Sequence, residues 1–423
     1  MSLQRSIRQP AAIRNPRRKH DNLRAAYRRL VGSMTEFESV VSPLGRDVFL
    51  RDYWLKNLVH IPGTAGRFAE LLTWNELNAI LEQHRLTPPR LKLYRDGQAV
   101  DPAHYLTSAI FGVPRLDAGG LATCLAHGAS LILDDVQELA PRVRDLLVGF
   151  QDTLHTDAFA NLYAGWHRQK AFHVHWDPQE AMVLQLRGRK HWKVYRPTRL
   201  HPLKNDIEAP PPPSEPPAWD GILNDGDLLY IPRGWWHEAF PLDEPSLHLT
   251  VSLTPPTAFD YLGWVMSRLR HHAELRASLT DGVAAQTETA RVIGELLAGT
   301  VTPASLSEFQ REWDANIRPN PHVRLPEAPY AQLAALADDS RIRLAALHLL
   351  NFSRQGEHFE FAASSRLWTV PAALMPALAK LRNSHDHSLA ELAGALTTPL
   401  AKGDLVKSLG VLAQAGIVLV AQK

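Results

Sequence analysis

Between about residues 157 and 255, polar and apolar residues alternate with a period of two. This alternation is typical of β-strands with one buried face, because successive side chains of a strand point to opposite sides. Turn residues separate the runs, and Gly188 falls between two of them. We therefore predict a mainly β core with added helices. The predicted strands are Phe159–Tyr163, Phe172–Asp177, Ala181–Leu186, Lys190–Tyr195, Asp227–Ile231 and Leu247–Leu253.

The segments that flank this β region have apolar residues at helical spacing. A winged helix-turn-helix is predicted near the C-terminus, because two helices are followed there by the strand that begins at Ile417. The predicted helices are Asp47–Leu55, Thr73–Leu81, Leu139–Leu154, Ala258–Leu279, Glu288–Leu297, Leu389–Leu396 and Asp404–Ala415.

Four regions follow from this pattern and from the composition along the chain. The first 33 residues carry nine Lys or Arg and one acid, Asp21, which predicts a basic and disordered arm. The predicted regions are the arm over 1–33, a β domain over 34–256, a helical segment over 257–329 and a winged helix over 330–423.

Composition excludes several classes of protein. The 423 residues include one cysteine, Cys124, so neither an internal disulfide framework nor a multi-cysteine metal site is possible. A formal net charge of +2 predicts no strong attraction to nucleic acid. No apolar run approaches the ~20 residues of a membrane helix, and the start lacks a signal-like apolar region. We expect a cytoplasmic protein with no membrane partner.

Three residues form a candidate metal site. In a strand, residues i and i+2 point the same way, so His175 and Asp177 would project from one face. A distant histidine at the mouth of another strand, His237, would complete two imidazoles and one carboxylate. Such a set leaves open positions on an octahedral metal, as in non-haem Fe(II) oxygenases.

The surroundings of His237 make this site more specific. Gly226, Pro232, Gly234 and His237 have the spacing G-x5-P-x-G-x2-H, which resembles the second motif of cupin barrels. Together with His175, this pattern resembles the Jumonji C oxygenases, and most closely the cupin-4-like ribosomal-oxygenase branch. The resemblance implies a double-stranded β-helix barrel as the catalytic domain, then a helical dimerisation segment and a winged helix.

The same resemblance implies the residues that bind 2-oxoglutarate. A basic residue fifteen positions after the first metal histidine binds the distal carboxylate in that branch, and here it is Lys190. Asn161 and Tyr163 stand where the branch has Asn-x-Tyr on an earlier strand. In Leu247–Leu253 the polar residues share one face, and His248 and Ser252 are implied to approach the cosubstrate and metal.

A second set of metal ligands remains open at this stage. His173, His175 and Glu180 nearly fit the first cupin motif, H-x-H-x4-E followed by Gly188. A four-ligand cupin centre would use His173, His175, Glu180 and His237. The presence of Asp177 and of the anchor lysine favours the three-ligand set.

The resemblance implies an Fe(II)-, 2-oxoglutarate- and O2-dependent hydroxylase that acts on a polypeptide, either a ribosomal protein or a peptide precursor. A lysine anchor, Lys190, favours histidine as the hydroxylated residue, with arginine or aspartate as alternatives. The apolar residues of Ala258–Leu279 and the resemblance predict a homodimer.

Two other classes remain as alternatives to an enzyme. One is a winged-helix regulator with a cupin sensor, although its helix would offer only Lys402 and Lys407 for phosphates, beside Asp404. The other is a scaffold that binds no metal.

Overall fold

The structure is a computed structural model. It describes residues 36–107, 112–204, 206, 211–317, 336–344, 353–363, 366–381, 386–396 and 402–421. The predicted basic arm over 1–33 lies outside these residues. Among the helices within them, none is both long enough and apolar enough to cross a membrane.

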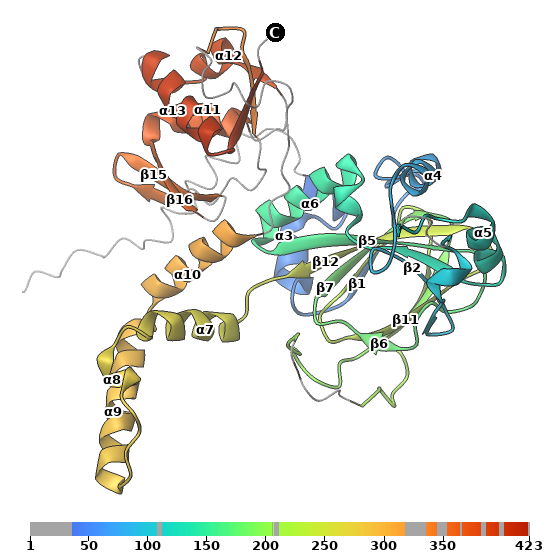
Figure 1. Cartoon of the computed structure of the whole chain (residues 1–423), viewed down its shortest axis with the longest axis horizontal. Helices are drawn as coiled ribbons and strands as arrows, with labels where there is room; N and C mark the ends of the chain where they lie inside the picture. Colours follow the sequence, from blue (N-terminus) through green and yellow to red (C-terminus); the bar gives the residue numbers. More distant parts are fainter. Residues whose placement is uncertain are drawn as a thin grey trace, which may run out of the picture.

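Two antiparallel sheets face each other and form a barrel (Figure 1). The larger sheet has the strand order β1-β10-β7-β12-β5-β4-β2-β3, and the smaller sheet has the order β6-β11-β8-β9. Strands far apart in the sequence are thus neighbours, as in the double-stranded β-helix that the resemblance implied. The strands are β1 (Val59–Ile61), β2 (Leu91–Arg95), β3 (Gln98–Ala99), β4 (Ser130–Leu133), β5 (Asp157–Gly165), β6 (His175–Trp176), β7 (Glu180–Arg187), β8 (Lys190–Tyr195), β9 (Trp219–Leu223), β10 (Leu228–Ile231), β11 (Trp236–Pro241) and β12 (Ser246–Thr254).

Helices cover the outer face of the larger sheet. On β7, Met182 and Leu184 pack in the core that this face shares with the helices, whereas Ala181 and Val183 pack between the two sheets with Trp192 of β8. Both faces of β7 are therefore buried. The covering elements are α2 (Glu36–Val40), α3 (Arg46–Val48), a π-helix (Phe49–Tyr53), α4 (Trp74–Gln83), α5 (Ala118–Ala126), α6 (Pro141–Leu154) and two 3-10 turns (Pro102–His104 and Val136–Glu138).

Local sequence signals explain where two of these helices begin. Thr73 caps α4, because its hydroxyl accepts from the Glu76 N–H while the Glu76 carboxylate accepts from the Thr73 N–H. Pro141 is the first residue of α6, where its missing N–H costs no hydrogen bond. The predicted helices over Thr73–Leu81 and Leu139–Leu154 are confirmed to within two residues at each end.

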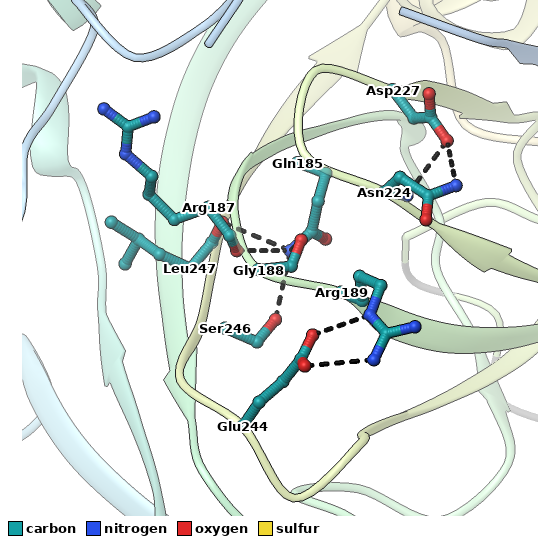
Figure 2. A network of polar contacts seen from close by, with 9 residues as sticks. All are labelled: Gln185, Arg187, Gly188, Arg189, Asn224, Asp227, Glu244, Ser246 and Leu247. Atoms are coloured by element: carbon teal, nitrogen blue, oxygen red, sulfur yellow. Dashed lines mark hydrogen bonds and ion pairs between the residues drawn. The ribbon is translucent and has the colours of Figure 1, made fainter. Parts of the chain in front are cut away.

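A β-bulge interrupts the pairing of β7 with β12 near the turn at Gly188. The register of the two strands shifts between Leu247 and His248, and Gln185 fills the irregularity (Figure 2). Its side-chain N–H groups donate to the carbonyl of Arg187 at 2.8 Å and to Ser246 Oγ at 3.0 Å. Gly188 has φ +65°, and a Cβ there would lie 2.0 Å from a backbone oxygen, so only glycine fits this turn.

Five of the six predicted strands match observed strands to within two residues. The prediction of a strand over Phe172–Asp177 is wrong, because only His175–Trp176 pairs with another strand. The prediction did not include β1 to β4, β9 or β11.

After the barrel the chain forms α7 (Ala258–Leu269), α8 (Ala273–Arg276), α9 (Val283–Thr300) and α10 (Pro303–Asn316), and α9 extends away from the barrel (Figure 1). The prediction of one helix over Ala258–Leu279 is wrong beyond Leu269. Tyr261, Val265 and Leu269 pack against Phe309 of α10, whereas Leu279 is exposed, so no packing supports a longer helix.

The C-terminal elements surround a separate apolar core. Two three-stranded sheets have the orders β17-β13-β18 and β14-β15-β16. The elements are β13 (Arg341–Leu344), β14 (Ser353–Gln355), β15 (His358–Ala363), β16 (Arg366–Pro371), a 3-10 turn (Ala372–Leu374), α11 (Met375–Leu381), β17 (His387–Ser388), α12 (Leu389–Ala393), α13 (Lys402–Gln414) and β18 (Val418–Ala421).

Candidate metal centre

Two imidazoles and a carboxylate meet at one end of the smaller sheet. β6 and β11 pair antiparallel with His175 directly opposite His237, and Asp177 immediately follows β6. One ligand atom from each of the three side chains lies within 4.8 Å of the others. His237 Nε2 is 3.5 Å from Asp177 Oδ2. The structure thus brings together the three residues that the sequence singled out.

Backbone carbonyls set which nitrogen each histidine offers. His175 Nδ1 lies 2.8 Å from the His173 carbonyl oxygen, and His237 Nδ1 lies 3.2 Å from the Trp235 carbonyl oxygen. Because a carbonyl oxygen can only accept, each Nδ1 donates its proton and leaves the Nε2 lone pair free. Burial, with a smaller effect of His175, lowers the pKa of His237 to about 4, so this imidazole is neutral at pH 7. The donor set fits a divalent transition metal.

The two further ligands of the four-ligand alternative lie elsewhere. His173 is exposed, and its ring lies against the turn at Gly97, where a Cβ would come within 2.3 Å of it. Glu180 is on the β7 face that carries Met182, opposite to the barrel interior. Its carboxylate accepts from the Tyr230 hydroxyl and from the Arg233 N–H.

Lys190 is a buried cation inside the barrel. It is 6% exposed, and β8 alternates so that Lys190 and Trp192 face inward. Among the described residues, no ion pair to a carboxylate includes Lys190. Burial lowers the pKa of Lys190 to about 7. A cation that costs this much to bury indicates a site for an anionic ligand.

The remaining predicted residues line the same interior from β5 and β12. These strands pair with Tyr163 opposite His248, and the two rings stack with centroids 4.8 Å apart and planes 4° from parallel. Lys190 Nζ lies 5.9 Å from the centroid of the Tyr163 ring. Asn161 Oδ1 accepts from the Asp135 N–H at 3.2 Å, and the Asn161 side chain also hydrogen-bonds to the Tyr163 hydroxyl. Ser252 shares the face of His248 and pairs with a residue at the start of β7.

Trp192 is a site residue that the sequence reasoning did not single out. Its ring lies 6.1 Å from the ring of His237 and 5.5 Å from that of His248, and Lys190 Nζ lies 5.8 Å from its centroid. It therefore stands between the cation and the candidate metal ligands. Its Nε1 is buried and has no hydrogen-bond partner among the described residues. Its position two residues after Lys190 on the same strand could have indicated that it shares the inner face of β8.

Comparisons with known proteins agree with this geometry. The model of the JmjC domain family matches residues 136–261. Among curated proteins, the bifunctional lysine-specific demethylase and histidyl-hydroxylase NO66 of Drosophila persimilis is 29% identical over 239 residues, which cover 52% of this chain and 32% of that protein. Ribosomal oxygenase 1 of Rattus norvegicus is 32% identical over 224 residues, 51% of this chain and 36% of that protein. The match thus spans about a third of these relatives.

Solved structures share the fold over most of the chain. The crystal structure of Escherichia coli ribosomal oxygenase YcfD covers 89% of this chain and 98% of its own, with a TM-score of 0.57 and 18% identity. YcfD in complex with cobalt and 2-oxoglutarate gives the same coverage, with a TM-score of 0.55 and 16% identity. Residues 136–261 thus match the JmjC domain family, and the chain shares the fold of a ribosomal oxygenase.

Proposed function

We propose that this protein is an Fe(II)- and 2-oxoglutarate-dependent hydroxylase of a polypeptide side chain. One observation carries the proposal: a cluster of two imidazoles and a carboxylate shares the barrel interior with Lys190, a buried cation that pairs with no carboxylate among the described residues. A dicarboxylate that chelates the metal at one end and pairs with Lys190 at the other satisfies both features.

Each residue has a defined role in this proposal. His175, Asp177 and His237 hold the metal through two Nε2 atoms and a carboxylate oxygen. The Lys190 ammonium binds the distal carboxylate of 2-oxoglutarate, and Tyr163 bounds the pocket beside it.

The other polar residues of β5 and β12 complete the pocket. Asn161 lies on β5 beside Tyr163, to which its side chain hydrogen-bonds, and His248 and Ser252 lie on the paired strand β12. Burial and the nearby Lys190 lower the pKa of His248, so it is neutral beside the lysine and adds no repulsive charge.

The bound iron would supply the oxidation, in which one oxygen atom of O2 enters a substrate C–H bond and the other enters succinate as CO2 leaves. The protein orients the metal ligands and excludes water. Its backbone carbonyls keep both Nδ1 atoms protonated, and the apolar core between the sheets keeps water from the pocket.

The substrate that we propose is a histidine of a ribosomal protein. Support comes from the names of the relatives, which are a histidyl-hydroxylase and ribosomal oxygenases. The lysine at the anchor position supports the same lineage. In this proposal the lysine contacts the cosubstrate and not the substrate, so it does not select the hydroxylated residue. A peptide precursor as substrate, or hydroxylation of arginine or aspartate, is therefore a separate outcome of the test.

The test is incubation of the protein with Fe(II), ascorbate, 2-oxoglutarate and cell-derived peptides, followed by mass spectrometry. We expect a gain of one oxygen on histidine, coupled to succinate, and no gain with the His237→Ala control. Incorporation only at arginine, at aspartate or in a free metabolite would contradict the proposed substrate. Metal binding without any oxygen incorporation would favour the sensor alternative over an enzyme.

We also propose that the helical segment over 257–329 forms a symmetric dimer. α7 presents Phe259, Leu262 and Met266 to solvent with exposed fractions of 68%, 47% and 57%. These residues lie on the side of α7 away from Tyr261 and Val265, which pack against α10. In the C-terminal region, the order of α12, α13 and β18 is compatible with the winged helix that we propose for residues 330–423.

A further inference from the structure

A buried acid on the face of β7 opposite to the barrel interior has no role in the chemistry described so far. Glu180 begins β7 and is 2% exposed. Its Oε2 atom accepts two hydrogen bonds, from the Tyr230 hydroxyl at 2.5 Å and from the Arg233 N–H at 3.2 Å. Burial of a carboxylate is costly unless it makes such bonds, so this position is built for an acceptor.

The second of these bonds reaches the turn that precedes a metal ligand. Arg233 belongs to the turn 232–235, which leads into β11 and His237. The N–H of the next residue, Gly234, donates to the Asp177 carbonyl at 2.9 Å. Gly234 has φ +82°, a conformation that favours glycine. The turn is therefore attached to Glu180 on one side and to the backbone of a second ligand on the other.

The turn 232–235 also orients the imidazole of His237, because the Trp235 carbonyl accepts from His237 Nδ1. A shift of this carbonyl would move the Nε2 atom that faces Asp177. Glu180 is thus connected to His237 through the Arg233 N–H and the short chain segment that follows it.

The first hydrogen bond connects Glu180 to the N-terminal helices. The Tyr230 hydroxyl also accepts from the Leu55 N–H at 2.9 Å. The Tyr230 ring packs against Phe49 and Trp54 with centroid distances of 5.1 and 5.8 Å. Tyr230 is 0% exposed, so these contacts hold its hydroxyl in place.

From this network we propose that Glu180 is a positioning residue for the metal centre: it fixes the turn 232–235 and so aims His237, without binding the metal itself. This role rests on the proposed metal site. It also gives Glu180 a function different from the one in the four-ligand alternative, where its carboxylate would coordinate the ion.

The test compares two variants of the full chain by titration with Co(II), followed by calorimetry and by the visible absorption of the bound ion. Glu180→Leu removes the acceptor, and we expect Co(II) affinity to fall about 10- to 100-fold. Glu180→Gln keeps an oxygen that can accept from Tyr230 and Arg233. We expect its affinity to stay within about threefold of wild type and its Co(II) spectrum to be unchanged.

Asp227 offers a matched control for a general loss of stability. It is a buried carboxylate that accepts from the Asn224 N–H at 2.9 Å (Figure 2) and from the Gly63 N–H at 2.8 Å. Among the described residues, none of the hydrogen-bond partners of its side chain belongs to the turn 232–235. We expect Asp227→Leu to lower the melting temperature while Co(II) affinity is retained.

The outcomes separate the two proposals. If wild-type protein does not bind Co(II), the proposed metal site is wrong. If wild type binds and Glu180→Leu binds equally well, or if Asp227→Leu loses as much affinity, the positioning role is wrong. A changed Co(II) spectrum in Glu180→Gln would mean that Glu180 is a ligand. Should Glu180→Leu not fold, Tyr230→Phe replaces it: a severalfold weaker affinity supports the role, and an unchanged one overturns it.

Discussion

Replacing Lys190 with methionine separates the cost of burying a charge from the benefit of binding an anion. The two side chains have similar length, and only lysine can carry a proton. Burial lowers the pKa of Lys190 from 10.5 to about 7. Each pKa unit corresponds to about 1.4 kcal/mol, so at pH 7 the lysine reduces the free energy of unfolding by about 4 kcal/mol. We expect Lys190→Met to be more stable than wild type by about this amount in the absence of ligands.

The pH dependence has a defined sign. Between about pH 7 and 10.5 the unfolded chain holds a proton that the folded chain has lost, so wild-type stability rises with pH in this window. Methionine has no such dependence. The advantage of the Lys190→Met variant should therefore fall from about 5 kcal/mol at pH 6 to about 2 kcal/mol at pH 9.

The assay is urea unfolding of metal-free protein at several pH values, followed by calorimetry with 2-oxoglutarate in the presence of Mn(II). Loss of a buried partner for a carboxylate costs on the order of 2–5 kcal/mol, so Lys190→Met should bind 2-oxoglutarate at least about 30-fold more weakly. Lys190→Arg should be intermediate, because its planar fork is longer and shaped differently. A Lys190→Met variant that is less stable at every pH, or that retains cosubstrate affinity, would refute the reasoning.

Two other predictions concern the metal ligands and the assembly. We expect Co(II) binding and turnover to be abolished by each of the substitutions His175→Ala, Asp177→Ala and His237→Ala. The far-UV circular dichroism should stay unchanged, because aliphatic side chains hold the barrel together. An equal loss of Co(II) binding in His173→Ala would restore the four-ligand alternative. Light scattering at micromolar concentration should give about twice the chain mass of 47.3 kDa, and Phe259→Glu should yield monomer; a wild-type mass near 47 kDa would contradict the dimer.

Several parts of the fold and site could be predicted from local sequence alone. The period of two locates β5, β8 and the second half of β12, where burial alternates along the strand. The strands β7 and β10 are buried along nearly their whole length, and they are located as short apolar runs. The same period places Lys190 and Trp192 together on the inner face of β8. Thr73 and Pro141 mark helix starts, because capping involves residues within one turn.

Other features depend on which distant segments meet. His173 and His175 have the same spacing to each other as His175 has to Asp177, so local pattern cannot separate a ligand from a neighbour. In the structure, only His175 pairs with β11, while His173 turns towards Gly97 at the end of β2. Likewise, the role of Glu180 requires Tyr230 and Arg233, which are about fifty residues away.

The sequence by itself thus determined five strands of the barrel, the inward face of β8 and the residue types suited to a metal and an anion. Only the tertiary structure decided which of those residues share the barrel interior, because strand pairing in a double-stranded β-helix joins segments that are remote along the chain. Lys190 shows the difference. Its place on β8 follows from alternation, whereas its depressed pKa and its closeness to the metal ligands arise from the packing of both sheets around it.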